Sequence, residues 1–346
     1  MNRGRIAVSV MPLETRRDVL IAVARIADRL GYDAFFMPET WAHDITVLLA
    51  EVALKTDRIG IGTGILGVWN RSPATIAMAA ATLTELSHGR FALGLGASTP
   101  QLTEGLHDVV YTRPLARMRQ TITQVRALLH GERVPLVVAK EARALKLNLP
   151  SAAGVTISMA ALGDDAIRLA GELADSWLPF LYPWSRLAEG RARLHEGAAR
   201  GGHPDRVPEI HPSVPVVVAQ DAETAREGAA WFVAFYLVNM GTMYRDALIR
   251  HGFGREVEAV LAANTPKFTG SVPADADELL EQLVVFGPPA EARRRLARWH
   301  AAGASMPALL LRPDQTPEEI AFTLEAFGPM LPPRRALRSL PWSSPS

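Results

Sequence analysis

Side chains that can move protons follow the second β-type run of the chain. The stretch "MPETWAHD" places Glu39, Trp41 and His43 close together after an apolar segment. A carboxylate at the end of a buried strand has its pKa set by burial and by its neighbours, so Glu39 is a candidate for proton transfer. His43 is a second candidate, although it could also be a substrate contact or an exposed residue at a helix start. For Trp41 the alternative is packing in the core or at the rim.

The sequence lacks the residue patterns that metal catalysis and nucleophilic catalysis use. The chain has 0 cysteines and contains neither an HExxH nor a GxSxG motif. The ends of the other β-type runs are instead rich in Gly, Ala and Ser, with aromatic residues between them. Small residues let a large planar ligand, such as a flavin-type ring, lie close to the backbone, where the cofactor carries the chemistry and the protein positions it. We therefore expect a cofactor of this kind and no metal.

A second feature, "AALGDDAIRLAG", leads from a β-type run into a helical one. Ala161, Leu162 and Gly163 carry no polar side chain, so the backbone N–H groups at the helix start could bind phosphate. Alternatively, Gly163 makes a tight turn and Asp164 caps the helix. The residues alone leave both interpretations open.

Eight β-type runs alternate with helical segments along the chain. They lie at residues 5–11, 33–38, 58–65, 90–96, 154–163, 175–181, 211–221 and 306–313. This alternation predicts a (β/α)₈ TIM barrel with insertions after several strands. An open doubly wound sheet is the rival, but it favours a glycine-rich phosphate loop after the first strand, and "VSVMPLE" has no glycine there. We expect one barrel domain over residues 1–330, a mostly helical insertion at about 222–303, and a Pro- and Ser-rich tail at 331–346.

Composition narrows the class of partner. Lys and Arg number 37 against 36 Asp and Glu, for a net charge of +1, and no basic stretch interleaved with aromatics points to nucleic acid. No apolar run reaches the roughly 18 residues that a membrane span needs. The first residues are typical of a strand rather than of a signal peptide. We expect a cytoplasmic protein that acts on a small molecule, with no nucleic-acid or membrane partner.

The segment from Thr56 to Ser98, "TDRIGIGTGILGVWNRSPATIAMAAATLTELSHGRFALGLGAS", resembles the signature of the luciferase-like flavin and deazaflavin oxidoreductases. It is most similar to the coenzyme F420-dependent members, and "AALGDDAIRLAGELADSWLP" extends the resemblance. The likeness covers residues 5–181 most strongly and 280–330 more loosely. It implies a TIM barrel, usually a homodimer, that binds reduced F420 or FMN at the carboxyl-terminal mouth.

The resemblance also implies roles for single residues. It places a non-proline cis peptide bond, which backs the central ring of the cofactor, at Gly64–Ile65. The cofactor-binding positions that it implies are Thr63, Gly64, Ile65, Ala97 and Ser98, with Ala161, Leu162, Gly163 and Asp164 around the phosphate. The weaker candidates for substrate contact are Trp69, His107 and Trp177.

Two positions depart from the family pattern. Several F420-dependent members carry an Asp-His pair after the second strand, where this chain has Glu39 and Thr40. Relatives often have a Trp-His pair where this chain has Leu106 and His107, which puts a stacking contact in doubt. The substrate chemistry of better-known members therefore does not carry over.

The hypothesis from the sequence is an oxidoreductase that moves a hydride between C5 of F420 and a small organic substrate. Glu39 and His43 would transfer the accompanying proton, and Trp41 would pack over the reacting centre. An FMN-dependent monooxygenase on the same barrel is the first alternative, and a non-catalytic barrel that binds a small ligand is the second. Neither the substrate nor the direction of transfer follows from the sequence.

Overall fold

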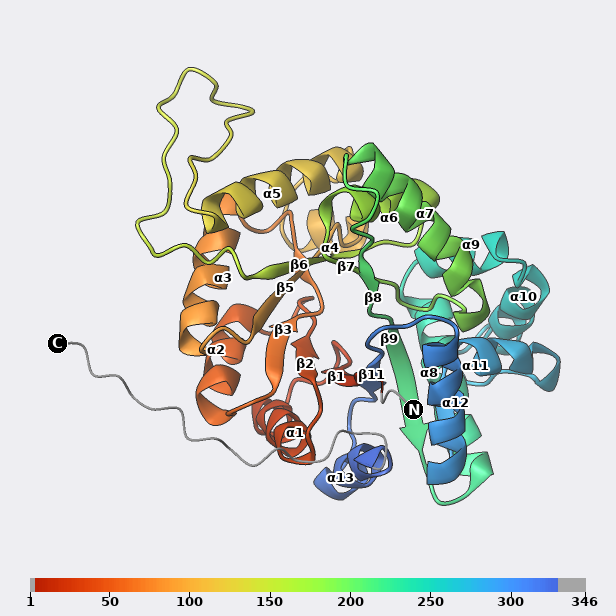
Figure 1. Ribbon diagram of the computed structural model, residues 1–346. Helices are drawn as coiled ribbons and strands as arrows, with labels where there is room; N and C mark the ends of the chain where they lie inside the picture. Colours follow the sequence, from red (N-terminus) through yellow and green to blue (C-terminus); the bar gives the residue numbers. More distant parts are fainter. Residues whose placement is uncertain (1–3, 329–346) are drawn as a thin grey trace.

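The strands form one closed parallel ring with helices packed around it (Figure 1). The computed structural model describes residues 4–328, so the tail predicted at 331–346 lies outside the described residues. The first half of the chain contributes β1 (Ala7–Val10), α1 (Arg17–Leu30), β2 (Ala34–Met37), α2 (Ile45–Lys55), β3 (Gly60–Thr63), β4 (Leu66–Gly67), α3 (Pro73–Leu86), β5 (Phe91–Gly96), α4 (Pro100–Gly105), α5 (Pro114–Leu129), β6 (Thr156–Ala160) and α6 (Asp164–Leu173).

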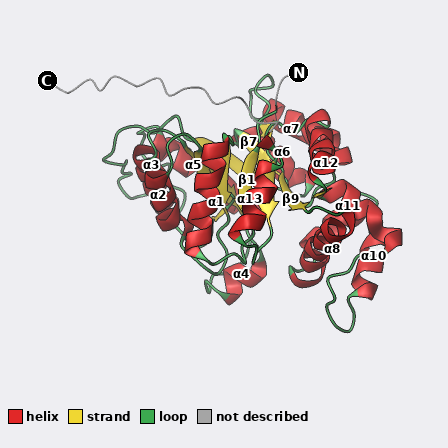
Figure 2. Ribbon diagram, turned by 90° about the horizontal axis from the view of Figure 1, so that it is seen from below, coloured by secondary structure: helices red, strands yellow, loops and turns green. Residues whose placement is uncertain are grey.

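The second half completes the ring and adds a helical lobe. It contributes β7 (Ser176–Leu178), α7 (Leu187–Arg200), β8 (Glu209–Ile210), β9 (Ser213–Val218), α8 (Ala222–Asn239), α9 (Met243–Arg250), α10 (Gly254–Ala263), α11 (Asp277–Leu283), β10 (Val285–Gly287), α12 (Pro289–Ala301), β11 (Ala308–Leu311) and α13 (Pro317–Glu325). Figure 2 shows α4 and the lobe of α8, α10 and α11 extending past the same end of the barrel. Since α4 follows β5 and α8 follows β9, this is the carboxyl end of the strands.

The barrel closes through one bent strand. β8 pairs with β7, and β9 pairs with β11, on the two sides of a break at His211 and Pro212. A parallel bridge between Phe180 and Ser213 joins the two halves. Counting β8 and β9 together, eight parallel strands lie at the predicted places in the order expected for a (β/α)₈ barrel. The TIM-barrel prediction is therefore confirmed, and the open doubly wound sheet is excluded.

The segment predicted as a mostly helical insertion, residues 222–303, holds helices α8 to α12 and one short strand. Four helices, α8 to α11, do fill residues 222–283, and they pack around a separate apolar core that includes Phe232, Leu237 and Leu279. β10 then adds a short strand alongside β9, and α12 returns over the barrel. Three residues are too few for a period-2 pattern to stand out, which is why the sequence did not reveal β10.

Glycines let two barrel strands approach closely. A Cβ atom on Gly62 would lie 2.6 Å from the carbonyl oxygen of Ala92, and one on Gly94 would lie 2.1 Å from that of Thr63. Real Cβ atoms do not come this close to a backbone oxygen, so no larger residue fits without moving β3 or β5. Ile61, on the other face of β3, is buried in the main core. In "IGIG" the glycines therefore lie on the face of β3 where neighbouring atoms leave no room for a side chain, and the isoleucines lie on the face that is buried in the core.

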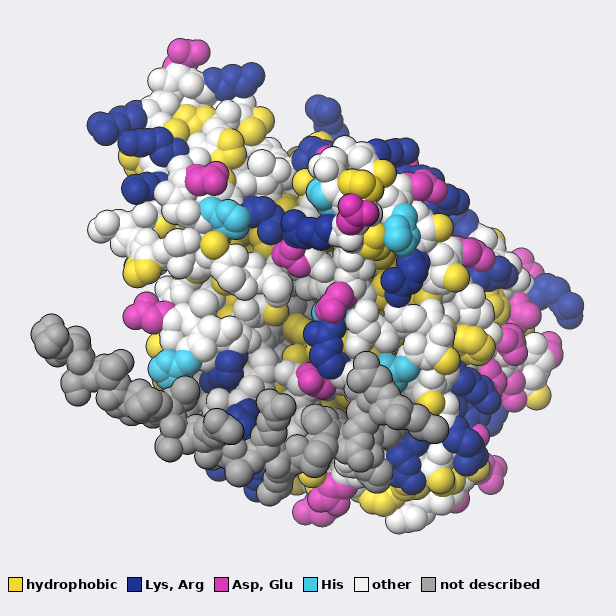
Figure 3. All heavy atoms as spheres, in the orientation of Figure 1, with side chains coloured by type: hydrophobic (Ala, Val, Ile, Leu, Met, Phe, Trp, Pro, Cys, Tyr) yellow, Lys and Arg dark blue, Asp and Glu magenta, His cyan; other side chains and the backbone are white. Residues whose placement is uncertain are grey.

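Charges are mixed over the face at the amino ends of the strands. Lys and Arg side chains alternate there with Asp and Glu rather than gathering into one basic field (Figure 3). Within residues 4–328, no helix is both long and apolar enough to cross a membrane.

Candidate active site

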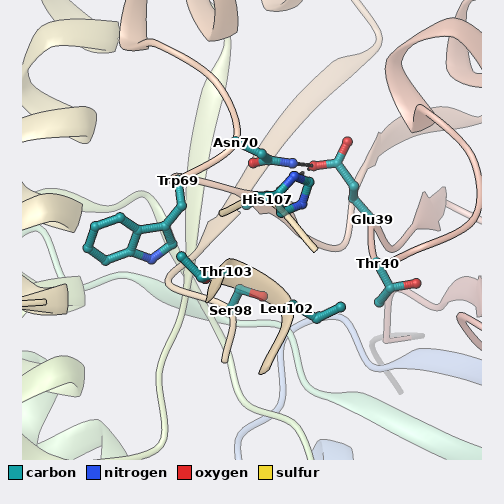
Figure 4. A pocket seen from close by; sticks show the side chains of 9 residues that line it. Glu39, Thr40, Trp69, Asn70, Ser98, Leu102, Thr103 and His107 are labelled. Atoms are coloured by element: carbon teal, nitrogen blue, oxygen red, sulfur yellow. Dashed lines mark hydrogen bonds between the residues drawn. The ribbon is translucent and has the colours of Figure 1, made fainter. Parts of the chain in front are cut away.

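A small pocket lies at the carboxyl ends of β2, β4 and β5, where TIM barrels carry their active sites (Figure 4). It is lined by Glu39, Thr40, Gly67, Trp69, Asn70, Ser98, Leu102, Thr103 and His107. Its free volume is about 10 Å³, which is close to the space that one water molecule needs. The pocket therefore fits a single polar group of a ligand rather than a whole ring.

Glu39 lines this pocket with both carboxylate oxygens already engaged. Its Oε2 accepts a hydrogen bond from Asn70 Nδ2 at 2.7 Å, and its Oε1 forms an ion pair with Arg71. The side chains of Glu39 and Arg71 are only 6% and 13% exposed. Burial opposes the charge on Arg71, but hydrogen bonds with Glu39 and Asp44 outweigh burial and raise the pKa of Arg71. A permanently charged guanidinium thus fixes Glu39 as a carboxylate acceptor.

His43 and Trp41 do not join Glu39 in the pocket, which corrects the predicted catalytic cluster. Nε2 of His43 is 2.9 Å from the carbonyl oxygen of Thr15, on the loop after β1. The Trp41 side chain is 47% exposed. Short spacing in "ETWAH" does not bring these side chains together, because the chain turns away toward Asp44, which caps α2.

His107 and Trp69 reach the pocket from two different loops. His107 follows α4, and Leu106 before it is 52% exposed. Trp69 donates its indole N–H to the carbonyl oxygen of Ala97 at 2.8 Å, and its ring lies 5.4 Å from that of Tyr111. Trp69 is thereby fixed as a wall of the pocket.

The sequence reasoning missed five lining residues, namely Thr40, Gly67, Asn70, Leu102 and Thr103. Asn70 is the most informative of them, because its Oδ1 is buried and has no hydrogen-bond partner among the described residues. Buried polar atoms are nearly always satisfied, so such an atom next to a pocket points to a missing donor. The available signal was "WNR" directly after the glycine-rich strand.

The peptide bond between Gly64 and Ile65 is cis, as the resemblance implied. The Ile65 side chain lies on Gly96, where a Cβ atom would approach Ile65 Cδ1 to 2.7 Å. Thr63, by contrast, is fully buried, and its hydroxyl group bonds the backbone of Gly94 in both directions, at 2.7 and 2.8 Å. The Thr63 side chain therefore joins two strands and offers no surface to a cofactor, contrary to the prediction.

The start of α6 is open, which favours the phosphate interpretation of "AALGDD". Gly163 is the N-cap, no side chain caps the helix, and a Cβ on Gly163 would meet no atom within 4 Å. The first intrahelical bond is from Ile167 N–H to Gly163, so the three preceding amides have no partner in the helix. Asp164 does not cap; its carboxylate pairs with Arg193 at 2.9 Å.

Two further predicted residues lie beneath this loop. Ala161 is buried, and its carbonyl oxygen accepts a 2.9 Å hydrogen bond from the Trp177 indole. Trp177 has 0% exposed surface and packs edge-on against Tyr182. The proposed substrate contact of Trp177 is therefore wrong, because the side chain supports the loop from inside the core.

A larger cavity of about 280 Å³ lies at the opposite end of the barrel, among residues such as Ala34, Gly60 and Ser176 that begin the strands. Two of its charged side chains already have protein partners. Arg5 pairs with Glu209 at 2.6 Å, and Arg90 donates hydrogen bonds to backbone carbonyl oxygens. TIM-barrel active sites lie at the other end of the barrel, at the carboxyl ends of the strands, so we place the active site there. No cluster of His, Asp and Glu in residues 4–328 could hold a metal ion.

Comparison with known proteins agrees with this geometry. The sequence model of the family described as "Luciferase-like monooxygenase" matches residues 5–306. A Mycobacterium tuberculosis protein named "Putative coenzyme F420-dependent oxidoreductase" is 33% identical over 305 residues, covering 81% of this chain and 87% of that protein. The 5,10-methylenetetrahydromethanopterin reductase of Archaeoglobus fulgidus is 26% identical over 292 residues, covering 81% of this chain and 86% of that enzyme. The structure of the F420-dependent tetrahydromethanopterin reductase from Methanopyrus kandleri superposes with a TM-score of 0.76 at 17% identity, covering 95% and 98% of the two chains.

Proposed function

The chain belongs to the luciferase-like monooxygenase family, and within this family we propose that it is a coenzyme F420-dependent oxidoreductase. The observation that carries the proposal is the 33% identity, over 81% of the chain, to a relative named for F420. When bound, reduced F420 supplies a hydride from its C5 atom. The remaining question is what the residues of this chain contribute to such a reaction.

The start of α6 supports the proposed binding of the cofactor phosphate. Unbonded backbone amides at the start of α6 and the positive end of the helix dipole favour an anion there. Asp164 in the first turn opposes an anion, but Arg193 and Arg168 neutralise it. Gly163 leaves the approach free of side-chain atoms. These residues fit a phosphate-bearing cofactor.

The ring-binding end would be formed by backbone and small side chains. Gly64 and Ile65 at the end of β3, with Ala97 and Ser98 after β5, present a surface without long polar side chains. Glu39, Asn70 and Arg71 hold the loop after β4 in place through their hydrogen bonds. Trp69 closes one side of the small pocket next to this surface.

Titration of the apoprotein with F420 and with FMN tests the cofactor. We expect quenching of F420 fluorescence with a micromolar or lower Kd, and FMN binding at least tenfold weaker. Reduction or oxidation of bound F420, followed at 420 nm with a panel of secondary alcohols, ketones and imines, would then identify the substrate class. Tight FMN binding without F420 binding would instead assign the FMN-dependent alternative. Cofactor binding without turnover of any compound would favour the ligand-binding barrel.

Substitution at Gly163 tests where the phosphate binds. Gly163→Asp fits sterically, because a Cβ there meets no atom within 4 Å, but it adds a third carboxylate to the helix start, beside Asp164 and Asp165. We expect the Kd for F420 to rise at least tenfold while the midpoint of thermal unfolding stays within about 2 °C. Gly163→Ala is the matched control and should bind F420 normally. Equal affinity of the two variants would place the phosphate elsewhere.

We further propose that two copies of the chain associate and work in the cytoplasm. Apolar side chains on adjacent helices support the association: Val47 and Leu54 on α2 and Met78 on α3 are 66%, 71% and 45% exposed. A chain with 0 cysteines is compatible with a reducing compartment. Light scattering should give about twice the chain mass of 37.6 kDa, and a mass of one chain would refute the association.

A further inference from the structure

We propose that His107 is the residue that exchanges a proton with the substrate, and that the small pocket beside it holds the substrate atom that gains or loses this proton. The proposal rests on the proposed function, since hydride transfer to or from an organic substrate requires an accompanying proton transfer. It assigns a catalytic role to a residue that the sequence offered only as a weak substrate contact.

The other proton carriers near the pocket are already occupied. Glu39 is bonded to Arg71 and Asn70, so both of its carboxylate oxygens already have protein donors. His43 lies outside the lining residues and bonds Thr15. Among the lining residues, only Glu39 and His107 have side chains that titrate. Elimination by contacts therefore leaves His107.

The His107 imidazole has no hydrogen bond or ion pair to any described residue, and it is half-buried at the pocket. Figure 4 shows it among the side chains that line the pocket, with Asn70 and Glu39. An imidazole gains and loses a proton near neutral pH, which suits a general acid or base. A ring without protein partners is free to take a ligand atom as its partner.

The pocket has the size and polarity for one substrate atom. About 10 Å³ of space accommodates one oxygen or nitrogen, and the unpaired Oδ1 of Asn70 is an acceptor that requires a donor. A hydroxyl or amine hydrogen on the substrate would supply that donor. The Ser98 hydroxyl lines the same space. A bare hydrocarbon or a carbonyl oxygen would leave Asn70 Oδ1 unsatisfied, so the geometry points to a substrate or product with an alcohol or amine group.

Charged groups around His107 are few and largely paired. Glu39 faces it from the end of β2 and is balanced by Arg71. Arg117, on α5, stands 5.6 Å over the Trp69 ring on another wall. On its own segment, Glu104 accepts the backbone N–H of Tyr111, and Asp108 follows directly. No charged side chain in residues 4–328 pairs with the His107 imidazole, so a ligand in the pocket can become its partner.

The reaction balances with one proton at His107. In the reducing direction, bound F420 would supply a hydride to a carbonyl carbon of the substrate, the C=O π bond would break, and the oxygen would need one proton. The oxygen then takes a proton from the imidazolium of His107, which forms the O–H bond and leaves a neutral imidazole. Water restores the proton to His107. Oxidation of an alcohol runs the same steps in reverse, with neutral His107 as the base.

Protection from chemical modification tests the placement of His107 without any turnover. Diethyl pyrocarbonate reacts with accessible imidazoles, and peptide mass spectrometry gives the rate at each histidine. We expect saturating F420 with a secondary alcohol or ketone to slow modification of His107 at least fivefold. His130, exposed at the end of α5, is the internal control and should react at an unchanged rate. An unprotected His107 in protein that demonstrably binds F420 would overturn the proposal.

Kinetics of His107→Gln test its role. With the substrate class identified above, we expect kcat to fall about 10²- to 10⁴-fold, the range for loss of a general acid or base. The Kd for F420 should stay within threefold, and the pH limb between 5 and 8 should disappear. His130→Gln should behave as the parent protein. If His107→Gln fails to fold, His107→Asn and the protection experiment on the parent protein still decide the matter.

The outcomes separate this proposal from the proposed function. The role of His107 would be refuted if kcat of His107→Gln stayed within fivefold of the parent value. It would also be refuted if the pH dependence of turnover were lost in His43→Gln and kept in His107→Gln. Either result would leave F420 dependence intact. Failure of the parent protein to bind F420 would refute the proposed function itself. Loss of F420 binding in His107→Gln alone would make His107 a binding residue and overturn its catalytic assignment.

Discussion

Removing the Glu39 carboxylate should destabilise the protein far more than removing a comparable surface carboxylate. Glu39→Ala leaves the Arg71 guanidinium, 13% exposed, without its main partner and leaves the Asn70 amide without an acceptor. Removing one member of a buried pair typically costs about 3–5 kcal/mol. Asp44, 50% exposed, still pairs with Arg71 at 2.9 Å, so we expect the lower end, about 3 kcal/mol.

Glu51→Ala is the matched control. Glu51 also pairs with two cations, Arg17 and Lys55, but their side chains are 59% and 47% exposed. Exposed pairs contribute about 1 kcal/mol or less. Each variant removes a glutamate that has two basic or amide partners. The difference between the two losses in unfolding free energy therefore reports how far burial of the partner side chains matters.

Urea unfolding, followed by fluorescence and by circular dichroism, measures both losses. The transition midpoints should separate while the m-values stay equal, which shows that the change lies in stability. In the double variant Glu39→Ala with Arg71→Met, the loss should be smaller than the sum of the single losses by about 2 kcal/mol. A loss below about 1 kcal/mol for Glu39→Ala would refute the claim that the buried pair holds this loop.

Three further predictions follow from single contacts. Gly94→Ala should prevent soluble expression or strongly lower the unfolding midpoint, because its Cβ would lie 2.1 Å from the Thr63 carbonyl oxygen. Gly105→Ala is the control and should change neither, because a Cβ there meets no atom within 4 Å. An equal effect of the two substitutions would contradict the close-approach argument. Thr316→Ala removes the N-cap of α13 and its capping box with Glu319, so urea unfolding should show a loss of about 1 kcal/mol, with Thr316→Ser restoring most of it. Hydrogen bonding to His211 and then Arg5 lowers the pKa of Glu209 from 4.5 to about 2. Its contribution to stability is therefore complete above pH 4.5 and lost as the pH falls toward 2; the difference in unfolding midpoint between the parent and Glu209→Gln should shrink over that range, and a constant difference would contradict the linkage.

The barrel could be predicted from sequence because its signals are local. Each of the eight strands is an apolar run between helical segments, and the resemblance placed the cis bond at Gly64–Ile65 correctly. β10 escaped because three residues carry no pattern. Thr63 misled because a hydroxyl at a strand end looks the same whether it faces a ligand or, as here, bonds the Gly94 backbone.

Proximity in the chain proved a poor guide to the catalytic cluster. Glu39 and His43 are four positions apart, yet Asp44 caps α2 and His43 turns to Thr15. Glu39 instead bonds Asn70 and Arg71 on a later loop and shares the pocket with His107 from another loop. A TIM barrel builds its site from the ends of several strands, so partners are set by strand order in the ring.

The pairing of Glu39 with Arg71 also explains why the proton carrier should be a different residue. A buried carboxylate can act as an acid only if its surroundings favour the neutral form, and a guanidinium in contact does the opposite. Once Arg71 is present, Glu39 serves better as a fixed acceptor that orients Asn70. The pocket then needs a separate group that can change its protonation state, and His107 is the lining residue that has this property and no other partner among residues 4–328.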